Sequence, residues 1–256
     1  MRRLSLLLMV ALALSLPVGT IASAPAHRFR VVFLKPRNKD EATIQSLVKA
    51  SRLSDVMAAL SERFILPRDV TIVVTPGSNG PYYDAARSVI VFNDDFAALV
   101  LNVFSREYPK ISQYRLGVLF ASVEYFVLFH ELGHAFVRMY DLPILGKEED
   151  AVDAISTVFM TEFVPNGGQI ALAAADLFGY LGSHHGRYGT VDFADEHSLD
   201  LQRMYDIACL VYGSDEKKWA RVGAFIPAER RPRCAAEWRQ KEHAFRVLLR
   251  PHIRPS

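Results

Sequence analysis

The amino-acid sequence predicts an α+β fold that is mostly helical and has a small β-sheet near the N-terminus. Short apolar or β-branched runs occur before residue 93, and helical periodicity prevails from Asp94 almost to the C-terminus. Half of the 256 residues are hydrophobic and 23% are charged, as in globular proteins with a sizeable core. The N-terminal part therefore supplies the predicted sheet, and the rest of the chain supplies the helices.

Three runs in the N-terminal part are predicted to be strands. Phe29–Leu34 is apolar, Val70–Val74 is β-branched and bounded by prolines, and Ser88–Phe92 comes after a Gly-Ser-Asn-Gly-Pro turn. Between the first two runs, Glu41–Phe64 carries helical periodicity that is interrupted near Ser54. We expect the three strands to form one small sheet.

A long helix, predicted at about Tyr114–Tyr140, belongs to the core. From Leu116 to Phe129 its only charged residue is Glu124, so the helix must be buried on most sides. Its uncharged run is too short, and the following sequence too polar, for a transmembrane span. The further helices are predicted at Lys147–Phe163, Gln169–Leu181, Ser198–Tyr212 and Ala235–Leu249, with a loop at Gly182–Glu196.

The first residues are typical of a secretory signal peptide. Two arginines precede an apolar stretch from Leu4 to Val18, and cleavage after Ala26 fits the small-x-small rule. An uncleaved membrane anchor is the alternative, but the stretch is short for a bilayer span and Pro17 interrupts it. We therefore expect residues 1–26 to be removed and the protein to be periplasmic or secreted, with no stable membrane span after cleavage.

Charge and chain organisation limit the remaining possibilities. A formal net charge of +2, with basic and acidic residues interspersed, gives no field that would favour nucleic acid as a partner. The sequence has no internal repeat and no linker long enough to divide the chain. We therefore predict a single domain over residues 27–256 and no nucleic-acid partner.

His130 and His134 are four residues apart on the long helix, so both imidazoles project from one face and can bind one metal ion. A catalytic zinc site uses three protein ligands and leaves the fourth position to water. Glu131 is then placed to accept a proton from that water, whose pKa zinc lowers to about 7. Two core histidines bonded to carbonyls are the alternative. Uncompensated imidazoles on a buried helix would be costly, so we favour the zinc site.

An acidic segment follows the long helix and supplies the other predicted site residues. Glu149 and Asp153 are one helical turn apart on a common face. We predict Glu149 as the third zinc ligand and Asp153 as the acceptor that fixes the tautomer of a liganding histidine, in the first place His130. The neighbouring acids Glu148 and Asp150 are assigned to the helix dipole.

A zinc peptidase also needs a hydrogen-bond donor for the tetrahedral oxyanion, and the candidates are His197, Arg203 and Tyr83. We predict His197, because it stands at the expected start of a helix after a flexible loop. Helix capping or simple surface exposure is its alternative role. For Arg203, a structural salt bridge with Asp200 or Asp195 is favoured over an oxyanion contact.

Cys209 and Cys234 are the two cysteines of the chain. In an oxidising compartment such a pair is more often a disulfide than two free thiols, although two buried thiols remain the alternative. The bridge would join two predicted helices. It would stabilise the fold by about 3 kcal/mol on the loop-entropy model.

The motif His130-Glu131-Leu132-Gly133-His134, followed by Glu149-x-x-x-Asp153, resembles the Glu-zincin pattern of thermolysin-like and neprilysin-like peptidases. A larger part of the chain, Leu66–Cys234, resembles a bacterial family described as putative metallopeptidases, in particular at Leu142–Asp150 and Asp195–Arg203. This resemblance implies a zincin-like domain and zinc-dependent hydrolysis, and it brings no known substrate.

These features predict an exported zinc-dependent peptidase that hydrolyses peptide bonds of a peptide or protein substrate by Glu131-assisted attack of zinc-bound water. A metzincin is excluded, because Val137 and Tyr140 stand where that pattern requires glycine and histidine. One alternative is a zinc-stabilised envelope binding module with weak or no catalysis. A helical domain without any metal is the other. Zn²⁺ is favoured over other divalent ions because the ligands combine imidazole and carboxylate.

Overall fold

The computed structural model describes residues 27–255. The predicted signal peptide, residues 1–26, lies outside the described residues. The described chain forms two compact units, one with the residues up to Glu124 together with Arg254 and Pro255, and the other with Tyr125–Ile253. The prediction of one domain over residues 27–256 stays a prediction, and each unit is described by itself below.

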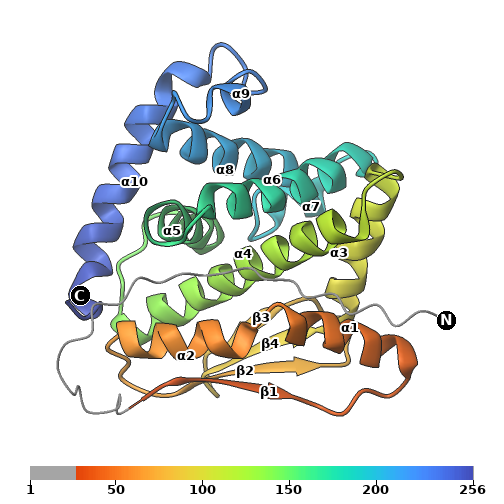
Figure 1. The fold of residues 1–256 in the computed structure, drawn as a ribbon. Helices are drawn as coiled ribbons and strands as arrows, with labels where there is room; N and C mark the ends of the chain where they lie inside the picture. Colours follow the sequence, from red (N-terminus) through yellow and green to blue (C-terminus); the bar gives the residue numbers. More distant parts are fainter. Residues whose placement is uncertain (1–26, 256) are drawn as a thin grey trace. The chain divides into compact units, whose positions relative to one another are not determined.

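The first unit contains a four-stranded mixed sheet with the strand order β1-β2-β4-β3 (Figure 1). The strands β1 (Phe29–Phe33), β2 (Val70–Thr75) and β4 (Val89–Asn93) are parallel, and β3 (Tyr82–Asp84) pairs antiparallel with β4 at the edge. Alternate residues of β2 are buried, as expected of a strand with one face on a core. The three predicted strands are present, and the short β3 is an addition to them.

The helices of the first unit follow the predicted periodicity. The helix α1 (Lys39–Ala50) is capped at its N-terminus by Asn38, whose side chain accepts a hydrogen bond from Glu41 N at 2.9 Å. Arg52 adopts a left-handed conformation (φ 62°) and separates α1 from α2 (Leu53–Arg63), close to the predicted interruption. The helix α3 (Asp94–Glu107) follows directly after β4. The helix α2 packs beside β1 (Figure 1).

Two carboxyl groups of the first unit are buried without full hydrogen bonding. Glu124 is 5% exposed, and neither of its carboxyl oxygens has a hydrogen-bond partner among the described residues. Asp94 accepts a hydrogen bond from Gln45 at 3.3 Å through Oδ2, whereas its Oδ1 has no partner in that part of the chain. Burial raises the pKa of both carboxyl groups, and the charge of Asp94 raises the pKa of Glu124 further.

The helix α4 (Gln113–Tyr140) contains the boundary between the two units. By length and composition it is the one described helix that could cross a membrane, yet 78% of its apolar window is buried inside the protein. This burial agrees with the prediction of a core helix.

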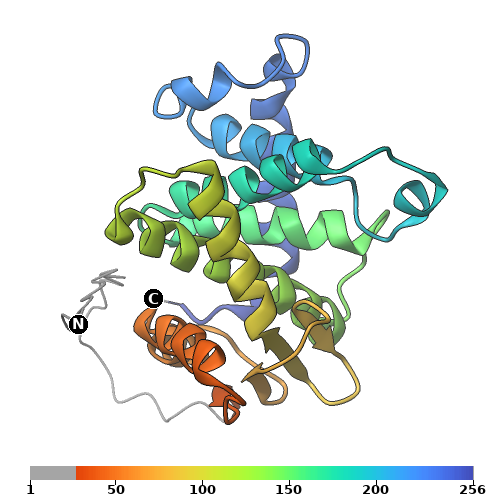
Figure 2. The same ribbon diagram turned by 90° about the vertical axis from the view of Figure 1, so that its right-hand side faces the viewer.

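Beyond α4, the second unit consists of helices (Figure 2). The larger ones are α5 (Glu148–Phe163), α6 (Gly167–His184), α8 (Asp200–Ser214) and α10 (Cys234–Leu248), each within a few residues of its predicted bounds. Short helices are α7 (Thr190–Ala194), α9 (Ala220–Gly223), η1 (Arg231–Arg233) and η2 (Arg250–His252). A core cluster joins α4, α6 and α8: Phe126, Ala171, Ala174, Ala175, Phe178, Ile207 and Val211.

The segment predicted as the loop Gly182–Glu196 is partly helical. The helix α6 continues to His184, and α7 occupies five residues of the predicted loop. Asp192 accepts a hydrogen bond from Gly189 N at 2.7 Å, which caps the start of α7. The prediction was wrong here because a five-residue helix is too short to show periodicity in the sequence.

Gly133 lies at a close contact between α4 and α5, between the two histidines of the motif. A Cβ atom on Gly133 would lie 2.8 Å from the Cβ of Val152 and 3.3 Å from its Cα. Only a glycine allows this separation, because a methyl group would overlap with the backbone region of α5. The close approach brings the face of α4 with both histidines against the first turns of α5.

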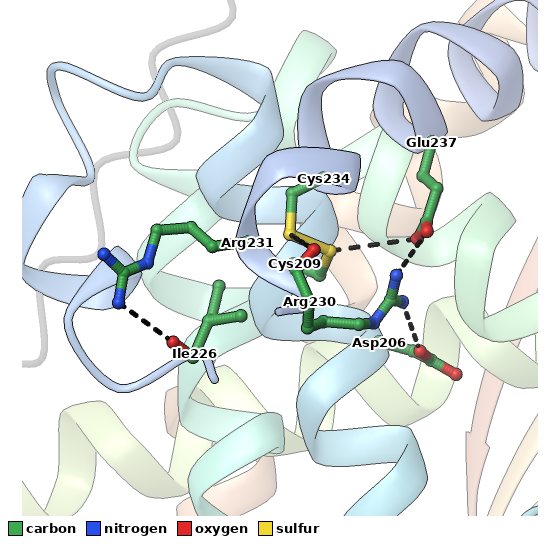
Figure 3. Close-up of a disulfide and its surroundings, with 7 residues drawn as sticks. All are labelled: Asp206, Cys209, Ile226, Arg230, Arg231, Cys234 and Glu237. Carbon is green, nitrogen blue, oxygen red and sulfur yellow. Dashed lines mark hydrogen bonds and ion pairs between the residues drawn. A yellow bond between two sulfur atoms is a disulfide. The ribbon is translucent and has the colours of Figure 1, made fainter. Parts of the chain in front are cut away.

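A disulfide between Cys209 and Cys234 joins α8 to the start of α10 (Figure 3). Both cysteines are completely buried. Beside the bridge, Arg230 forms ion pairs with Asp206 and Glu237, as Figure 3 shows. The predicted pairing of the two cysteines is therefore present in the structure.

Candidate metal centre

Three residues of the motif, His130, Glu131 and His134, lie on α4 in the second unit, and the two histidines are one turn apart. His130 and Glu131 are each 5% exposed, and the side chain of His134 is 14% exposed. The rings of His130 and His134 have their centres 5.0 Å apart. The two imidazoles thus face the same region, as the four-residue spacing predicts.

Glu149, in the first turn of α5, lies at the centre of a group of imidazoles. Its Oε2 is 3.0 Å from Nε2 of His130 and 3.0 Å from Nε2 of His197, and its Oε1 is 3.3 Å from Nε2 of His134. Three Nε2 atoms from α4 and from the segment before α8 therefore converge on one carboxylate. Burial would raise the pKa of Glu149, but the close approach of the three histidines outweighs it and lowers this pKa.

Each of these histidines also has a carboxylate next to its other ring nitrogen. Nδ1 of His130 lies 2.7 Å from Asp153 Oδ1, and Nδ1 of His134 lies 2.9 Å from Glu148 Oε1. Nδ1 of His197 lies 3.1 Å from Asp195 Oδ1. Liganding histidines commonly donate the second ring N–H to a carboxylate, which fixes the tautomer that leaves Nε2 free for a metal.

The structure places Asp153 beside Nδ1 of His130, where the sequence predicts the acceptor. That Asp153 orients His130 for a bound metal stays a prediction. The sequence assigns Glu148 to the helix dipole, and the structure adds a contact with Nδ1 of His134 that this assignment does not include. The sequence shows that Glu148 stands next to Glu149 in the first turn of α5. It does not show that the Glu148 side chain meets His134, because this contact depends on how α5 packs against α4.

Two arginines hold the carboxylates that support His130 and His134. Arg203 donates to Asp153 through Nε at 2.8 Å and through Nη2 at 3.0 Å, and its guanidinium lies 3.9 Å from the ring centre of Phe178. Arg138 donates to Glu148 at 3.3 Å. The expected salt bridge of Arg203 is thus formed with Asp153, and not with Asp200 or Asp195. Asp153 lies on α5, and its two hydrogen bonds with Arg203 form a bidentate pair, which is strong and fixes the geometry of both groups.

Burial and ion pairing set the charges of this group. Burial raises the pKa of Glu131. For Asp153, burial acts in the same direction, but Arg203 and His130 outweigh it and lower its pKa. Burial lowers the pKa of His134, whereas its hydrogen bonds with Glu149 and Glu148 raise it, with the result that this pKa is raised to about 9.

His197 is held by its own segment. Asp195 Oδ1 accepts a hydrogen bond from His197 N at 2.8 Å, and Lys147 donates to the carbonyls of Asp195 and His197 at 2.9 and 3.0 Å. These contacts turn the imidazole towards Glu149. The third oxyanion candidate, Tyr83, lies in the first unit, where its hydroxyl is 3.3 Å from Ser88 Oγ.

The donor atoms form a group that could hold a metal ion. Candidate ligand atoms of His130, Glu149 and His197 all lie within 4.8 Å of one another, and imidazole nitrogen with carboxylate oxygen is a donor set that zinc accepts. The Nδ1 atoms of the histidines are already engaged with carboxylates, so the free Nε2 atoms are the ones available to a metal. The ligand roles predicted for His130, His134 and Glu149 stay predictions.

Comparison with known proteins gives one family. A model of the family described as "Putative metallopeptidase" matches residues 33–249, which is well over half of the chain. Searches of curated proteins and of solved structures found no match. The family resemblance predicted from the sequence is confirmed, and this chain belongs to the family described as putative metallopeptidases.

Proposed function

We propose that this protein is an exported zinc-dependent peptidase. The observation that carries the proposal is the convergence of His130, His134 and Glu149. The Nε2 atoms of the histidines lie 3.0 and 3.3 Å from the Glu149 carboxylate, and Glu131 is the neighbour of the first histidine. Membership in a family of metallopeptidases supports hydrolysis of a peptide or protein substrate.

In this proposal His130, His134 and Glu149 would hold the ion. A bound zinc ion supplies Lewis acidity, which lowers the pKa of water to about 7 and polarises a carbonyl oxygen. Zinc is favoured because two imidazoles and one carboxylate are a common catalytic ligand set for it. Asp153 orients His130 through Nδ1, and Arg203 keeps Asp153 in place.

Glu131 is the proposed general base. Its carboxyl group is buried and its pKa is raised by burial, which brings it closer to the range in which a carboxylate accepts a proton effectively near neutral pH. It would take a proton from the attacking water and later pass a proton to the leaving amine. Glu131 follows His130 directly on α4, the helix that carries both proposed histidine ligands.

Export is supported by two features of different kinds. The N-terminal sequence has the pattern of a cleavable signal peptide. The disulfide between Cys209 and Cys234 is of the kind that persists in oxidising compartments. We therefore place the mature protein in the periplasm or outside the cell.

The test compares wild type, Glu131→Gln and the control Glu216→Gln, an exposed glutamate in the connection after α8. Elemental analysis should find zinc in all three proteins, and a peptide-library screen should find cleavage by wild type and the control only. Cleavage by Glu131→Gln at the wild-type rate would exclude Glu131 as the base. A zinc-loaded wild type that cleaves nothing would favour the zinc-stabilised binding module instead.

A further inference from the structure

We propose that His197 is a fourth protein ligand of the metal, so that the resting centre contains three imidazoles and one carboxylate. The inference rests on the proposed function for the metal, but not on peptide hydrolysis. It gives His197 a role other than the oxyanion donor that the sequence suggests.

Nε2 of His197 lies beside the same carboxylate as the Nε2 atoms of His130 and His134. Nε2 of His197 lies 3.0 Å from Glu149 Oε2, the oxygen that is also 3.0 Å from Nε2 of His130. The rings of His130 and His197 are nearly parallel, with an interplanar angle of 15° and centres 6.4 Å apart. An oxyanion donor has to point at the substrate, whereas His197 points at the same carboxylate oxygen as a proposed ligand does.

The hydrogen bonding at Nδ1 of His197 matches that of the other two histidines. His197 has a carboxylate at this nitrogen, Asp195, just as His130 has Asp153 and His134 has Glu148. This arrangement is typical of liganding histidines and makes the opposite nitrogen a better electron-pair donor. The same feature therefore marks all three imidazoles around Glu149.

The backbone of the segment that carries His197 is bonded to the residue before α5. Lys147, the residue before α5, donates to the carbonyls of both Asp195 and His197. These two hydrogen bonds attach the segment to the start of α5, the helix that carries Glu149. Such a tether would hold His197 at a metal without burying it, and its side chain is 41% exposed compared with 6% for His130.

A consequence for the reaction follows from the number of ligands. Four protein ligands complete a tetrahedral zinc site, and structural sites are closed in this way, whereas catalytic sites keep an open position. His197 is the most exposed of the proposed donors and is carried by a connecting segment and not by a long helix. It is therefore the ligand that would leave when substrate enters.

The experiment uses Co²⁺ as a spectroscopic probe of the metal-free full-length mature protein. Wild type, His197→Ala, Asp195→Asn and the control His185→Ala are titrated, and the visible absorption and the dissociation constant are recorded. His185 belongs to the same connection but stacks on Tyr188. We expect His197→Ala to change the absorption spectrum and to weaken binding at least about tenfold, Asp195→Asn to weaken it less, and the control to match wild type.

The possible outcomes separate the two proposals. If His197→Ala binds Co²⁺ with the affinity and spectrum of wild type, His197 is not a ligand, and a loss of turnover alone in that variant would assign it to the oxyanion. If the wild type binds no Co²⁺, the metal site itself is refuted. Weaker binding by His197→Ala in a protein that cleaves no peptide would support the ligand and refute the peptidase. Circular dichroism of each variant shows that the fold is retained.

Discussion

Glu148 Oε1 lies 2.9 Å from Nδ1 of His134, and Arg138 holds the other carboxylate oxygen at 3.3 Å. Glu148 thus makes with His134 the same kind of contact that Asp153 makes with His130. An acidic residue that the sequence assigns to a helix dipole thus supports a proposed ligand directly.

Replacing Glu148 by alanine should weaken zinc binding by about 10- to 100-fold, because His134 loses the acceptor that orients it and raises its basicity. Isothermal titration with zinc measures the change. Asp150→Ala is the matched control, since it removes one negative charge from the same first turn of α5. Equal losses in the two variants would assign the effect of Glu148 to the helix dipole.

Gly133→Ala should lower both stability and zinc affinity. The added methyl group would lie 2.8 Å from Val152 Cβ, and such overpacking costs about 1–3 kcal/mol. The better helix propensity of alanine returns about 1 kcal/mol. We expect a net loss of about 1 kcal/mol in the free energy of unfolding, measured with urea, and weaker zinc binding because α5 is displaced.

Gly186→Ala is the control for that substitution, because a Cβ atom there meets no atom within 4 Å. Its free energy of unfolding should stay within about 0.5 kcal/mol of wild type. Unchanged zinc affinity in Gly133→Ala would show that the contact between α4 and α5 does not position the ligands.

Removing the disulfide with Cys209→Ala and Cys234→Ala should lower the free energy of unfolding by about 3 kcal/mol. The two cysteines are 25 residues apart, and opening a loop of this size increases the entropy of the unfolded chain. None of the proposed metal ligands lies within that loop, so zinc stoichiometry should be retained at low temperature. A reducing agent should destabilise wild type and leave the double variant unchanged.

Glu124→Gln should stabilise the protein at alkaline pH. Burial raises the pKa of Glu124 well above its usual value, so the folded state keeps a proton that the unfolded chain releases as the pH rises above about 4.5. Stability therefore declines as pH increases towards the folded pKa, and the glutamine variant avoids this loss. Urea unfolding at pH 5 and pH 8 measures it.

The difference in the free energy of unfolding between Glu124→Gln and wild type should favour the variant more at pH 8 than at pH 5. Glu107→Gln, at the exposed end of α3, is the control and should show no pH-dependent difference. An advantage that is the same at both pH values would mean that Glu124 is ionised in the folded protein.

The sequence predicts the larger elements well, because their signals are local. Leu116–Phe129 with one charge marks a buried helix, and β-branched residues between two prolines mark β2. The strand β3, with three residues, and the helix α7, with five, are too short for a period to appear. The direction of the strands, parallel for β1, β2 and β4, also depends on pairing that no single segment encodes.

For the candidate site, spacing along a helix predicts which side chains share a face, and this pairs His130 with His134 on α4 and Glu149 with Asp153 on α5. It does not predict contacts between distant segments. Arg203 meets Asp153 across 50 residues, and His197 reaches Glu149 from a connecting segment. Both depend on the packing of α8 and of the chain before it against α5, which is a tertiary property.

Glu148, Glu149 and Asp153 all lie on α5. The angles between successive side chains of this one helix therefore determine how the three carboxylates meet the histidines. Each residue of an α-helix advances the direction of its side chain by about 100°. An insertion or deletion between Glu149 and Asp153 would turn one of them away from α4, whereas a change of length in residues 142–146 leaves their mutual angle intact. Natural variation in length should therefore be tolerated before this helix and absent inside its first two turns.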